Sequence, residues 1–387
     1  MEISTFTFNA VALVVLCIGN GIPVRTSVPG KSQVVFKGGN EEEFKVFLNQ
    51  VYQKIQVNVE AKIQVKKNVY DKIAKIMAKV AKYDPCYNFR VEFKGSTYEG
   101  LKIDKPDEFD FDLVNDNWAG KISLLENKTT PVGFGYAVRT VKTCLDKFTI
   151  PGTRCINANK VRGHLRELVE KAIEESGLQG QIVKRPWEGG PVVTFEILWP
   201  GFPFISIDLA ISLELQHWPP NARSPPPGIK NPRAGLVPKV KPGANPVFWQ
   251  ISTAKVESQI MQGIDNDGGC RKKVLQLAKY FMGKGLSKWY PLATYHLKTI
   301  LFHMNDRWKL TGDWAQGKLV TRFREFIDRL LGHIQKKSLP SFFFPDLNLF
   351  EDKKKDLESA KKGIDLFLTM LRTNPQDLMR DNLYDGA

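Results

Sequence analysis

Apolar residues recur every three or four positions along much of the chain, and this spacing predicts helices. Between residues 41 and 83 it predicts one long helix, or two in series, with an apolar stripe of Val69, Ile73, Ile76 and Val80. Another helix is expected over 158–176. The later part of the chain is predicted to be helical throughout, with helices near 253–264, 270–283, 290–304, 316–335 and 354–373.

Strand patterns are confined to the part of the chain before residue 216. Residues 89–93 and 108–112 predict strands, and residues 192–198 and 204–215 predict a hairpin around Trp199-Pro-Gly-Phe-Pro203. Strands mixed with flanking helices indicate an α/β (α+β) lobe with a mixed sheet. The sequence therefore predicts a bilobal chain, in which an all-helical C-terminal lobe faces the sheet across a cleft that would bind the ligand.

Changes in composition suggest four segments along the chain. We expect a leader over 1–38, which could be disordered, then a sheet lobe with the long N-terminal helix over 39–218. A proline-rich connection over 219–246 precedes the helical lobe over 247–387.

The run Ala10–Gly19 is too short to span a bilayer, and no other stretch is apolar enough to do so. It resembles the apolar part of a signal peptide, although Glu2 and no basic residue precede it. We therefore favour a flexible or interfacial extension over a secretory signal.

Composition adds a strong positive charge to this picture. With 42% hydrophobic residues the chain is globular, and a net charge of +15 with a pI near 9.4 points to a polyanionic partner. Charge alone does not separate nucleic acid, an acidic membrane and a nucleotide. The five cysteines are scattered and lack CxxC spacing, which argues against a disulfide framework and a zinc ribbon and favours a reducing, cytoplasmic compartment.

The stretch from Gly95 to Asp112 contains the first candidate chemistry. Alternation along Glu108-Phe-Asp-Phe-Asp112 would place its three carboxylates on one face and its two phenylalanines in the core. Carboxylates on one face repel each other, and a divalent cation removes that cost. The turn Gly95-Ser96 could offer backbone N–H groups and a hydroxyl to a phosphate. Taken alone, the same pattern also suits an edge strand with a solvated acidic face.

A third acid shifts the balance toward a metal site. Asp208 lies in the middle of Phe204–Glu214, a strand that is mostly apolar on both faces. Buried acids are rare unless they are paired or bind metal. Beside Glu108 and Asp110, Asp208 would complete a two-metal site of the kind that promotes displacement at phosphorus.

Lysines recur along the outer side of the long N-terminal helix. They could form a solvated face or a ridge that binds the phosphate backbone of a nucleic acid. The candidate nucleic-acid-binding residues are Lys62, Lys66, Lys72, Lys75, Lys79 and Lys82.

With these acids in place, the chain resembles nucleotidyltransferases of the cyclic GMP-AMP synthase and male-abnormal-21 family. That family has a Gly-Ser turn, an acid-x-acid pair on a strand and a lone Asp on a later strand. The resemblance continues through Trp249–Glu257, Cys270–Tyr280, Tyr295–His303 and Phe344–Phe350, so it covers residues from about 60 to the end.

The resemblance implies a metal-dependent enzyme that joins ATP and GTP into a cyclic dinucleotide for innate, antiviral signalling. Glu108, Asp110 and Asp208 would hold two Mg²⁺ or Mn²⁺ ions, and Asp208 would help to deprotonate the attacking ribose hydroxyl. The nucleotide contacts that it implies are Gly95, Ser96, Gln250, Lys279, Thr294 and Tyr295. Tyr295 could equally be a core aromatic.

Two departures from the vertebrate enzyme narrow this expectation. The interval between Gln262 and Gly269 lacks the His and Cys ligands of the vertebrate zinc thumb, and Cys270 is its sole flanking thiol. Tetrahedral zinc needs four ligands, so we expect no structural zinc and a closer likeness to invertebrate receptors, several of which sense double-stranded RNA. Gln250 replaces a base-contacting Arg, which leaves the nucleotide preference open.

The resemblance further implies activation by duplex RNA or DNA, with a ligand-induced dimer as one outcome. Docking on the lysine helix would shift it and order the Gly95–Asp107 loop. Three alternatives stay open at this point: a catalytically silent scaffold of the same family, a linear oligonucleotide synthase, and a basic nucleic-acid binder without chemistry.

Overall fold

The computed structural model describes residues 32–103, 105–239, 247–283, 292–310, 312–351 and 354–379. The chain divides into two units, Met1–Ser32 and Gln33–Ala387, and everything below concerns the second. The predicted leader up to residue 31, including the apolar run Ala10–Gly19, lies outside the described residues. No helix in the described ranges is long and apolar enough to cross a membrane.

The last residues of the predicted leader belong to the core. Val34 and Phe36 are buried, and the Phe36 ring stacks on Phe44 with 5.0 Å between centroids. The ordered body therefore begins before residue 39, because two apolar side chains close to the first helix are enough to hold this segment in place.

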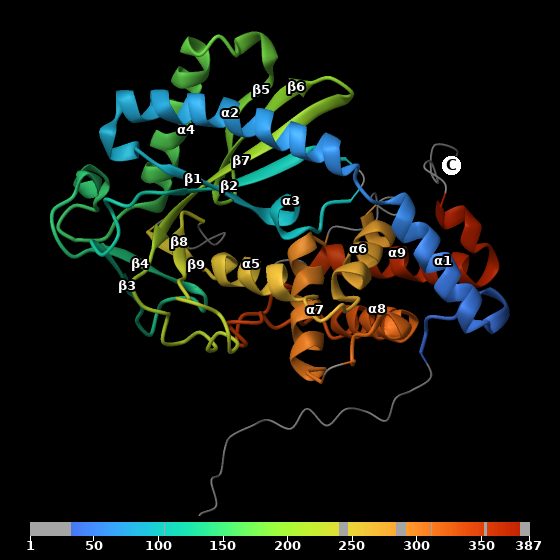
Figure 1. Cartoon of the computed structure of the whole chain (residues 1–387). Coiled ribbons are helices and arrows are strands. Elements are labelled where there is room, and N and C mark those ends of the chain that lie inside the picture. Colours follow the sequence, from blue (N-terminus) through green and yellow to red (C-terminus); the bar gives the residue numbers. More distant parts are fainter. Residues whose placement is uncertain are drawn as a thin grey trace, which may run out of the picture. The chain divides into compact units, whose positions relative to one another are not determined.

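Two helices in series occupy residues 41–83, α1 (Glu41–Lys54) and α2 (Val59–Tyr83). The Asn40 side chain caps α1 by accepting from the backbone N–H groups of Glu42 and Glu43. The predicted stripe of α2 is buried, from Val69 to Val80. In Figure 1, α2 runs across the sheet, while α1 lies among the helices of the C-terminal region.

The described residues form one nine-stranded mixed sheet in the order β1-β2-β7-β8-β9-β4-β3, with β6 also on β7 and β5 on β6. Strands β2 and β7 are parallel, and the other pairs are antiparallel. The strands are β1 (Arg90–Lys94), β2 (Glu108–Val114), β3 (Ile122–Leu125), β4 (Phe134–Arg139), β5 (Ile182–Gly189), β6 (Val192–Trp199), β7 (Phe202–Glu214), β8 (Gly235–Val237) and β9 (Phe248–Ser252).

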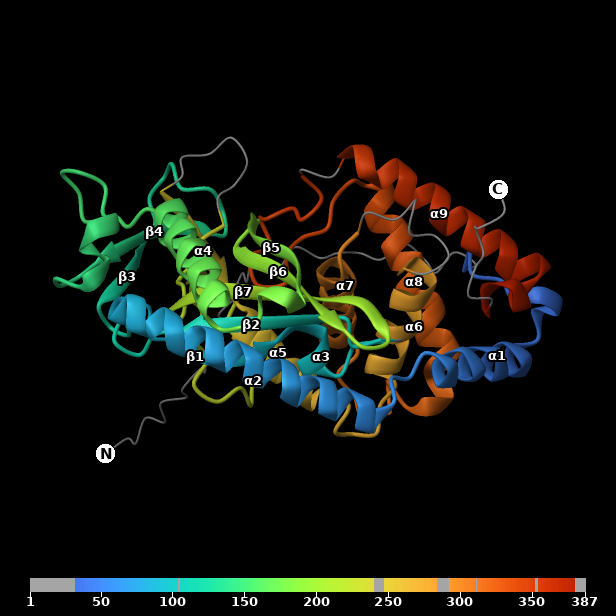
Figure 2. The same cartoon turned by 90° about the horizontal axis from the view of Figure 1, so that it is seen from above.

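Helices α2 and α4 (Ala158–Glu175) cover one face of this sheet, as Figure 2 shows from above. The predicted apolar positions of α4 are buried. On this side Tyr70 of α2 stacks on Phe93 of β1, which in turn packs on Phe111 of β2. Since side chains alternate along β2, its acidic residues face the opposite side of the sheet.

The C-terminal region is helical, as predicted, and it packs around a cluster of phenylalanines that includes Phe281, Phe323 and Phe367. Phe44 and Phe47 of α1 join this cluster, although the sequence grouped α1 with the sheet. The helices are α5 (Ala254–Gly263), α6 (Arg271–Gly283), α7 (Thr294–Arg307), α8 (Leu319–Gln335) and α9 (Lys354–Thr373). Short helical pieces are α3 (Gly95–Glu99), η1 (Lys37–Gly39), η2 (Pro85–Tyr87), η3 (Cys144–Phe148), η4 (Gln179–Gln181), η5 (Gln316–Lys318) and η7 (Pro375–Met379).

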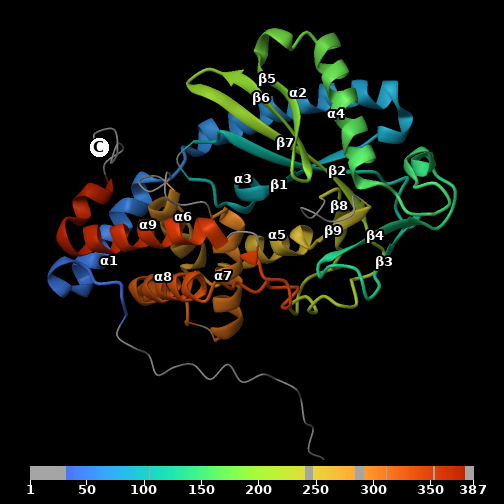
Figure 3. The same cartoon turned by 180° about the vertical axis from the view of Figure 1, so that it is seen from behind.

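Part of the predicted proline-rich connection is a strand of the sheet. Within 219–246, β8 pairs with the end of β7 on one side and with β9 on the other, and Figure 3 shows β8 and β9 together. Leu236 and Val237 are buried. Three residues are too few to reveal periodicity, so the flanking prolines dominated the prediction. Residues 240–246 of the connection lie outside the described ranges.

The expectation that the cysteines form no disulfide is wrong. Cys86 and Cys144, which are 58 positions apart in the sequence, form a disulfide between η2 and η3. Cys155 and Cys270 are free. Spacing along the chain did not predict a pair that only the fold brings together, and the cysteines therefore no longer argue for a reducing compartment.

Candidate active site

Two adjacent parallel strands bring the predicted acids together. Asp110 of β2 lies directly opposite Asp208 of β7 in the strand register. Phe109 and Phe111 are 1% and 0% exposed on the other face, so the alternation read from the sequence holds. One carboxylate oxygen from each of Glu108, Asp110 and Asp208 lies within 4.8 Å of the other two, as a shared metal ion would require.

The third acid of β2 has a different partner. Asp112 accepts hydrogen bonds at both carboxylate oxygens from Lys94 of β1, at 2.7 and 2.6 Å. The ammonium neutralises Asp112 and holds it away from the other acids. The cluster is therefore limited to three carboxylates.

Electrostatics in the cluster favour a cation. Burial, and then the charges of Glu108 and Asp208, raise the pKa of Asp110 to about 7, although Lys102 and Lys94 act in the opposite direction. Burial also raises the pKa of Asp208, while a hydrogen bond of 2.7 Å from Thr194 Oγ1 to Asp208 Oδ1 opposes this shift. The positive charges near these acids do not compensate their negative charge, and carboxylate oxygens are suitable ligands for a divalent ion.

The predicted Gly-Ser turn is the start of the short helix α3. Gly95 has a φ of +71°, and a Cβ at this position would collide with Asp110 Oδ2, so only glycine allows the backbone to approach the acids so closely. Ser96 follows half-buried, and its carbonyl accepts from the N–H groups of Leu101 and Lys102.

A cavity of about 590 Å³ lies against the acids. Asp110 and Asp208 line it from the sheet, Gln250 from β9, Tyr295 from α7 and Gly95 from α3. Its wall is completed by the segment from Ser341 to Leu349. Ser96, Lys279 and Thr294 are not among the described residues that line it, and Thr294 is half-buried at the start of α7.

Tyr295 is held at one end and open at the other. Burial, followed by the charge of Glu257, raises the pKa of its hydroxyl, and Thr299 Oγ1 donates to its backbone carbonyl at 2.9 Å. The residue is nevertheless 39% exposed and lines the cavity, which leaves part of the ring accessible. A fixed aromatic ring at a cavity wall suits stacking against a planar base.

Two lysines lie close to the acids. Burial, and then Lys102, lower the pKa of Lys279 to about 8, against the opposing charges of Glu108 and Asp110. Lys102 is buried and pairs with Asp107 at 2.8 Å and Glu108 at 3.4 Å. The sequence did not single out Lys102, although its place in the short basic loop between Gly95 and Glu108 was a usable signal.

The lysines of α2 divide into two groups. The pKa of Lys62 is lowered by burial and then by Lys66 and by Lys272 of α6, so these three cations share one surface. Lys66 also lies over the rings of Phe93 and Tyr98, at 4.3 and 5.5 Å from their centroids.

The second group extends along the outer side of α2. Lys72 donates to Gln181 Oε1 at 2.6 Å, while Lys75 and Lys82 are exposed and Lys79 is half-buried. The two groups point to different sides of the helix, so the six predicted lysines do not form one continuous ridge.

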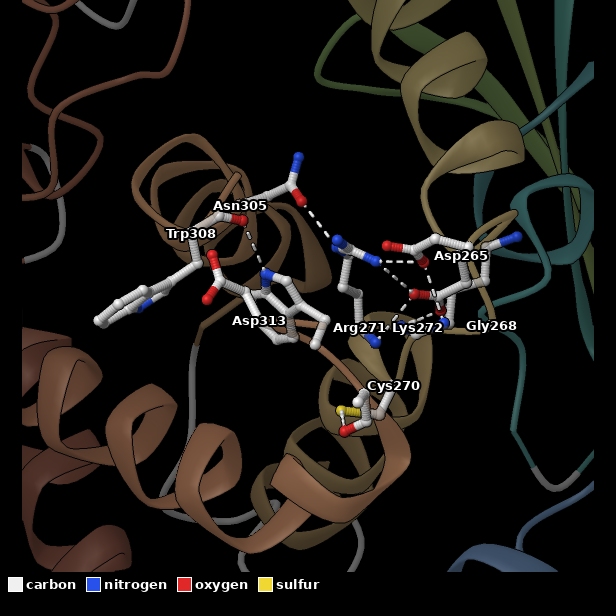
Figure 4. Close-up of polar contacts among 12 residues, drawn as sticks. Asp265, Gly268, Cys270, Arg271, Lys272, Asn305, Trp308 and Asp313 are labelled. Atoms are coloured by element: carbon white, nitrogen blue, oxygen red, sulfur yellow. Dashed lines mark hydrogen bonds and ion pairs between the residues drawn. The ribbon is translucent and has the colours of Figure 1, made fainter. Parts of the chain in front are cut away.

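The loop between α5 and α6 is held by an arginine (Figure 4). The Asp265 carboxylate accepts from the N–H groups of Arg271 and Lys272 at the start of α6, at 3.0 and 2.8 Å. The buried Arg271 guanidinium donates to Asp267 and Asn305, both at 2.7 Å. Burial raises the pKa of the nearby Cys270 thiol to about 11. The absence of a zinc ion stays a prediction, and these contacts describe what holds the loop.

Comparisons with known proteins agree with this geometry. Residues 97–263 match the family model described as the Mab-21 protein nucleotidyltransferase domain, and residues 270–364 match the Mab-21 protein HhH/H2TH-like domain. The chain is similar to the cyclic GMP-AMP synthase-like receptor 3 of Stylophora pistillata, with 27% identity over 283 residues, which is 69% of this chain and 77% of that protein.

Proposed function

Since the chain belongs to the Mab-21 family of nucleotidyltransferases and is cyclic GMP-AMP synthase-like, we propose that it is a metal-dependent cyclic dinucleotide synthase. The observation that carries this proposal is the meeting of Glu108, Asp110 and Asp208 beside a cavity that also contains the Tyr295 ring. We propose ATP and GTP as substrates and pyrophosphate as the leaving group.

The three acids would hold two Mg²⁺ or Mn²⁺ ions, which, when bound, neutralise the charge that develops at the attacking and leaving oxygens. The ribose hydroxyl forms a bond to the α-phosphorus while the bond to pyrophosphate breaks. Asp208 accepts the proton of that hydroxyl. Because Thr194 already donates to Oδ1 of Asp208, we assign the proton to Oδ2.

The remaining roles concern binding of the nucleotide. Gly95 and Ser96 contact the phosphates, because residue 95 carries no side chain between the backbone and the acids. Lys279, whose charge interacts with Glu108 and Asp110, binds the triphosphate. The Tyr295 ring stacks on a base, Thr294 offers a hydroxyl beside it, and Gln250 contacts a base edge from β9.

We further propose that duplex nucleic acid, double-stranded RNA in particular, activates the enzyme in antiviral signalling. Lys62 and Lys66 are the strongest candidates of the predicted set, because Lys272 extends their charge and Lys66 contacts Tyr98 of α3. Lys72, Lys75, Lys79 and Lys82 would form a second contact. Duplex RNA would be recognised through shape and backbone, with dimerisation on the ligand.

We propose a cytoplasmic location, where such a ligand would meet its receptor. The Cys86–Cys144 disulfide is unusual for that compartment and is the observation against it. Imaging of the full-length chain with a C-terminal tag, together with thiol labelling of cell extracts, tests both points.

The deciding experiment incubates the full-length chain with ATP, GTP and Mn²⁺, with and without duplex RNA or DNA, and identifies products by mass. A cyclic dinucleotide that appears only with a duplex supports the proposal. Linear products would indicate an oligonucleotide synthase, and nucleases specific for 2′-5′ or 3′-5′ bonds assign the linkage. No product with any ligand would favour a silent scaffold or a plain nucleic-acid binder.

A further inference from the structure

We infer that Glu99 is a positioning residue that fixes the Gly95–Ser96 backbone against the helical region. The inference rests on the proposed function only where it concerns nucleotide turnover. Glu99 lines the same cavity and lies at the last position of α3, four residues after Gly95. In Figure 1, α3 lies between the sheet and helices α5 and α6.

Glu99 is a buried carboxylate with partners on two different helices. It is 4% exposed, its Oε1 accepts from Ser258 Oγ of α5 at 2.8 Å, and it pairs with Lys298 Nζ of α7 at 3.1 Å. A carboxylate so deeply buried is tolerated only because both contacts are present. These contacts fix the end of α3 relative to both helices.

A third helix holds the residue that follows. Gly100 ends α3 in the left-handed conformation with a φ of +76°, and its carbonyl accepts from Gln276 Nε2 of α6 at 3.2 Å. Three helices of the C-terminal region therefore contact two consecutive residues. So short a helix has little stability of its own, which means that these contacts set its position.

The opposite side of α3 is fixed against the acids. Thr97 Oγ1 donates to the carbonyl of Glu108 at 3.2 Å, and Gly95 lies against Asp110. Movement at Glu99 is thus transmitted over one helical turn to the backbone that we assign to the phosphates. Glu99 touches neither acid and acts through this helix alone.

Lys298 also links Glu99 to the side of the cavity where Tyr295 lies. Its ammonium also pairs with Glu257 at 3.1 Å, and Glu257 accepts from Thr253 at 2.7 Å and lies close enough to Tyr295 for its charge to raise the pKa of the tyrosine. One ammonium is therefore shared by two buried carboxylates. If Glu99 is removed, Lys298 keeps Glu257 as its partner, so Tyr295 stays anchored while α3 is released.

The test compares Glu99→Leu, which removes both contacts, with Glu99→Gln, which keeps an oxygen for Ser258 and Lys298. Hydrogen exchange of the full-length chain without nucleotide should speed up about tenfold at the amides of 95–102 in Glu99→Leu, the effect of losing a buried hydrogen bond. Glu99→Gln should stay within about twofold of wild type.

Glu325→Leu is the matched control for general destabilisation. Glu325 pairs with Arg322 and Arg329 in the helical region, and it has no contact with α3 among the described residues. This variant should leave exchange at 95–102 unchanged. Wild-type exchange there in a folded Glu99→Leu protein would overturn the inference, as would equal acceleration in the control. If Glu99→Leu does not fold, Ser258→Ala, which removes one contact, decides by the same readout.

The nucleotide KM distinguishes a positioning role of Glu99 from a role in stability alone. In the synthesis assay Glu99→Leu should raise the nucleotide KM about tenfold, with full rescue in Glu99→Gln. A wild-type chain that makes no product would refute the proposed function, while the exchange measurement would still decide the role of Glu99.

Discussion

Two groups of acids in this molecule have opposite electrostatic environments. Glu108, Asp110 and Asp208 crowd together on the sheet, where burial and mutual repulsion raise the pKa of Asp110 to about 7. Asp265 and Asp267 lie at the α5–α6 loop, where a hydrogen bond from Arg271 lowers the pKa of Asp267 despite its partial burial. Among the described residues, Asp110 and Asp208 form no ion pair and Glu108 pairs with Lys102 at 3.4 Å, whereas Arg271 pairs with both acids of the second group. We propose that the acids without an ion pair form the reaction site, whereas the acids paired with Arg271 stabilise the α5–α6 loop.

The largest effect should follow from the loss of one uncompensated acid. Asp208→Asn should lower nucleotidyl transfer by about 10²–10⁴-fold, because the amide neither accepts the ribose proton nor binds a cation well. Stability should not fall. Product formation within threefold of wild type would contradict the assigned role, with circular dichroism to confirm folding.

Removal of the Arg271 guanidinium should lower the stability of the protein, whereas loss of Asp208 should lower its activity. Arg271→Met removes the buried guanidinium that bonds Asp265 and Asp267, and the loss of these charge-assisted contacts should cost about 2 kcal/mol of unfolding free energy. Denaturant unfolding measures this cost. The comparison fails if this variant is as stable as wild type.

A third prediction is that substitution of Asp110 stabilises the metal-free protein. In protein without metal, Asp110→Asn should raise the free energy of unfolding by about 1 kcal/mol, since it relieves burial and repulsion of a charge. Added Mn²⁺ should stabilise wild type and leave this variant unaffected. Destabilisation by Asp110→Asn in metal-free buffer would show that the cluster is already balanced.

The matched substitution at Asp267, in the group of acids paired with Arg271, should lower the free energy of unfolding, and by less than Asp110→Asn raises it. Asp267→Asn should cost less than 1 kcal/mol at neutral pH, because its carboxylate is partly exposed. Since the folded pKa lies below the ordinary 3.8, this contribution is present above that pH and disappears as the pH falls through the folded value. Unfolding at several pH values checks it, and a cost that persists in acid would have another origin.

Local patterns predicted what depends on neighbours in sequence. Alternation assigned Phe109 and Phe111 to the core and the acids to the other face, and the isolated Asp208 in an apolar strand was expected beside Asp110, where the strand register places it. Helical spacing located α4 through α9, because each has an apolar stripe long enough to detect.

Contacts between distant segments were not predictable in this way. The Cys86–Cys144 bond, the pairing of β8 and the Arg271–Asp267 contact each need a spatial neighbour that sequence spacing does not reveal. Glu99 belongs to the same class, since its partners Ser258 and Lys298 are 159 and 199 positions away. The sequence placed the three candidate acids on two strands, but it did not reveal the distant contacts that hold the surrounding helices in place.

Manganese binding tests the central claim most directly. Titration of Mn²⁺ in the presence of ATP, followed by electron paramagnetic resonance, should give two bound ions per wild-type chain, both held by the three acids and one of them also bound to ATP. Asp110→Asn should abolish binding of at least the ion that ATP does not carry, whereas Asp267→Asn should bind as wild type does. Unchanged binding in Asp110→Asn, or its loss in Asp267→Asn, would contradict the assignment of the metal site to Glu108, Asp110 and Asp208.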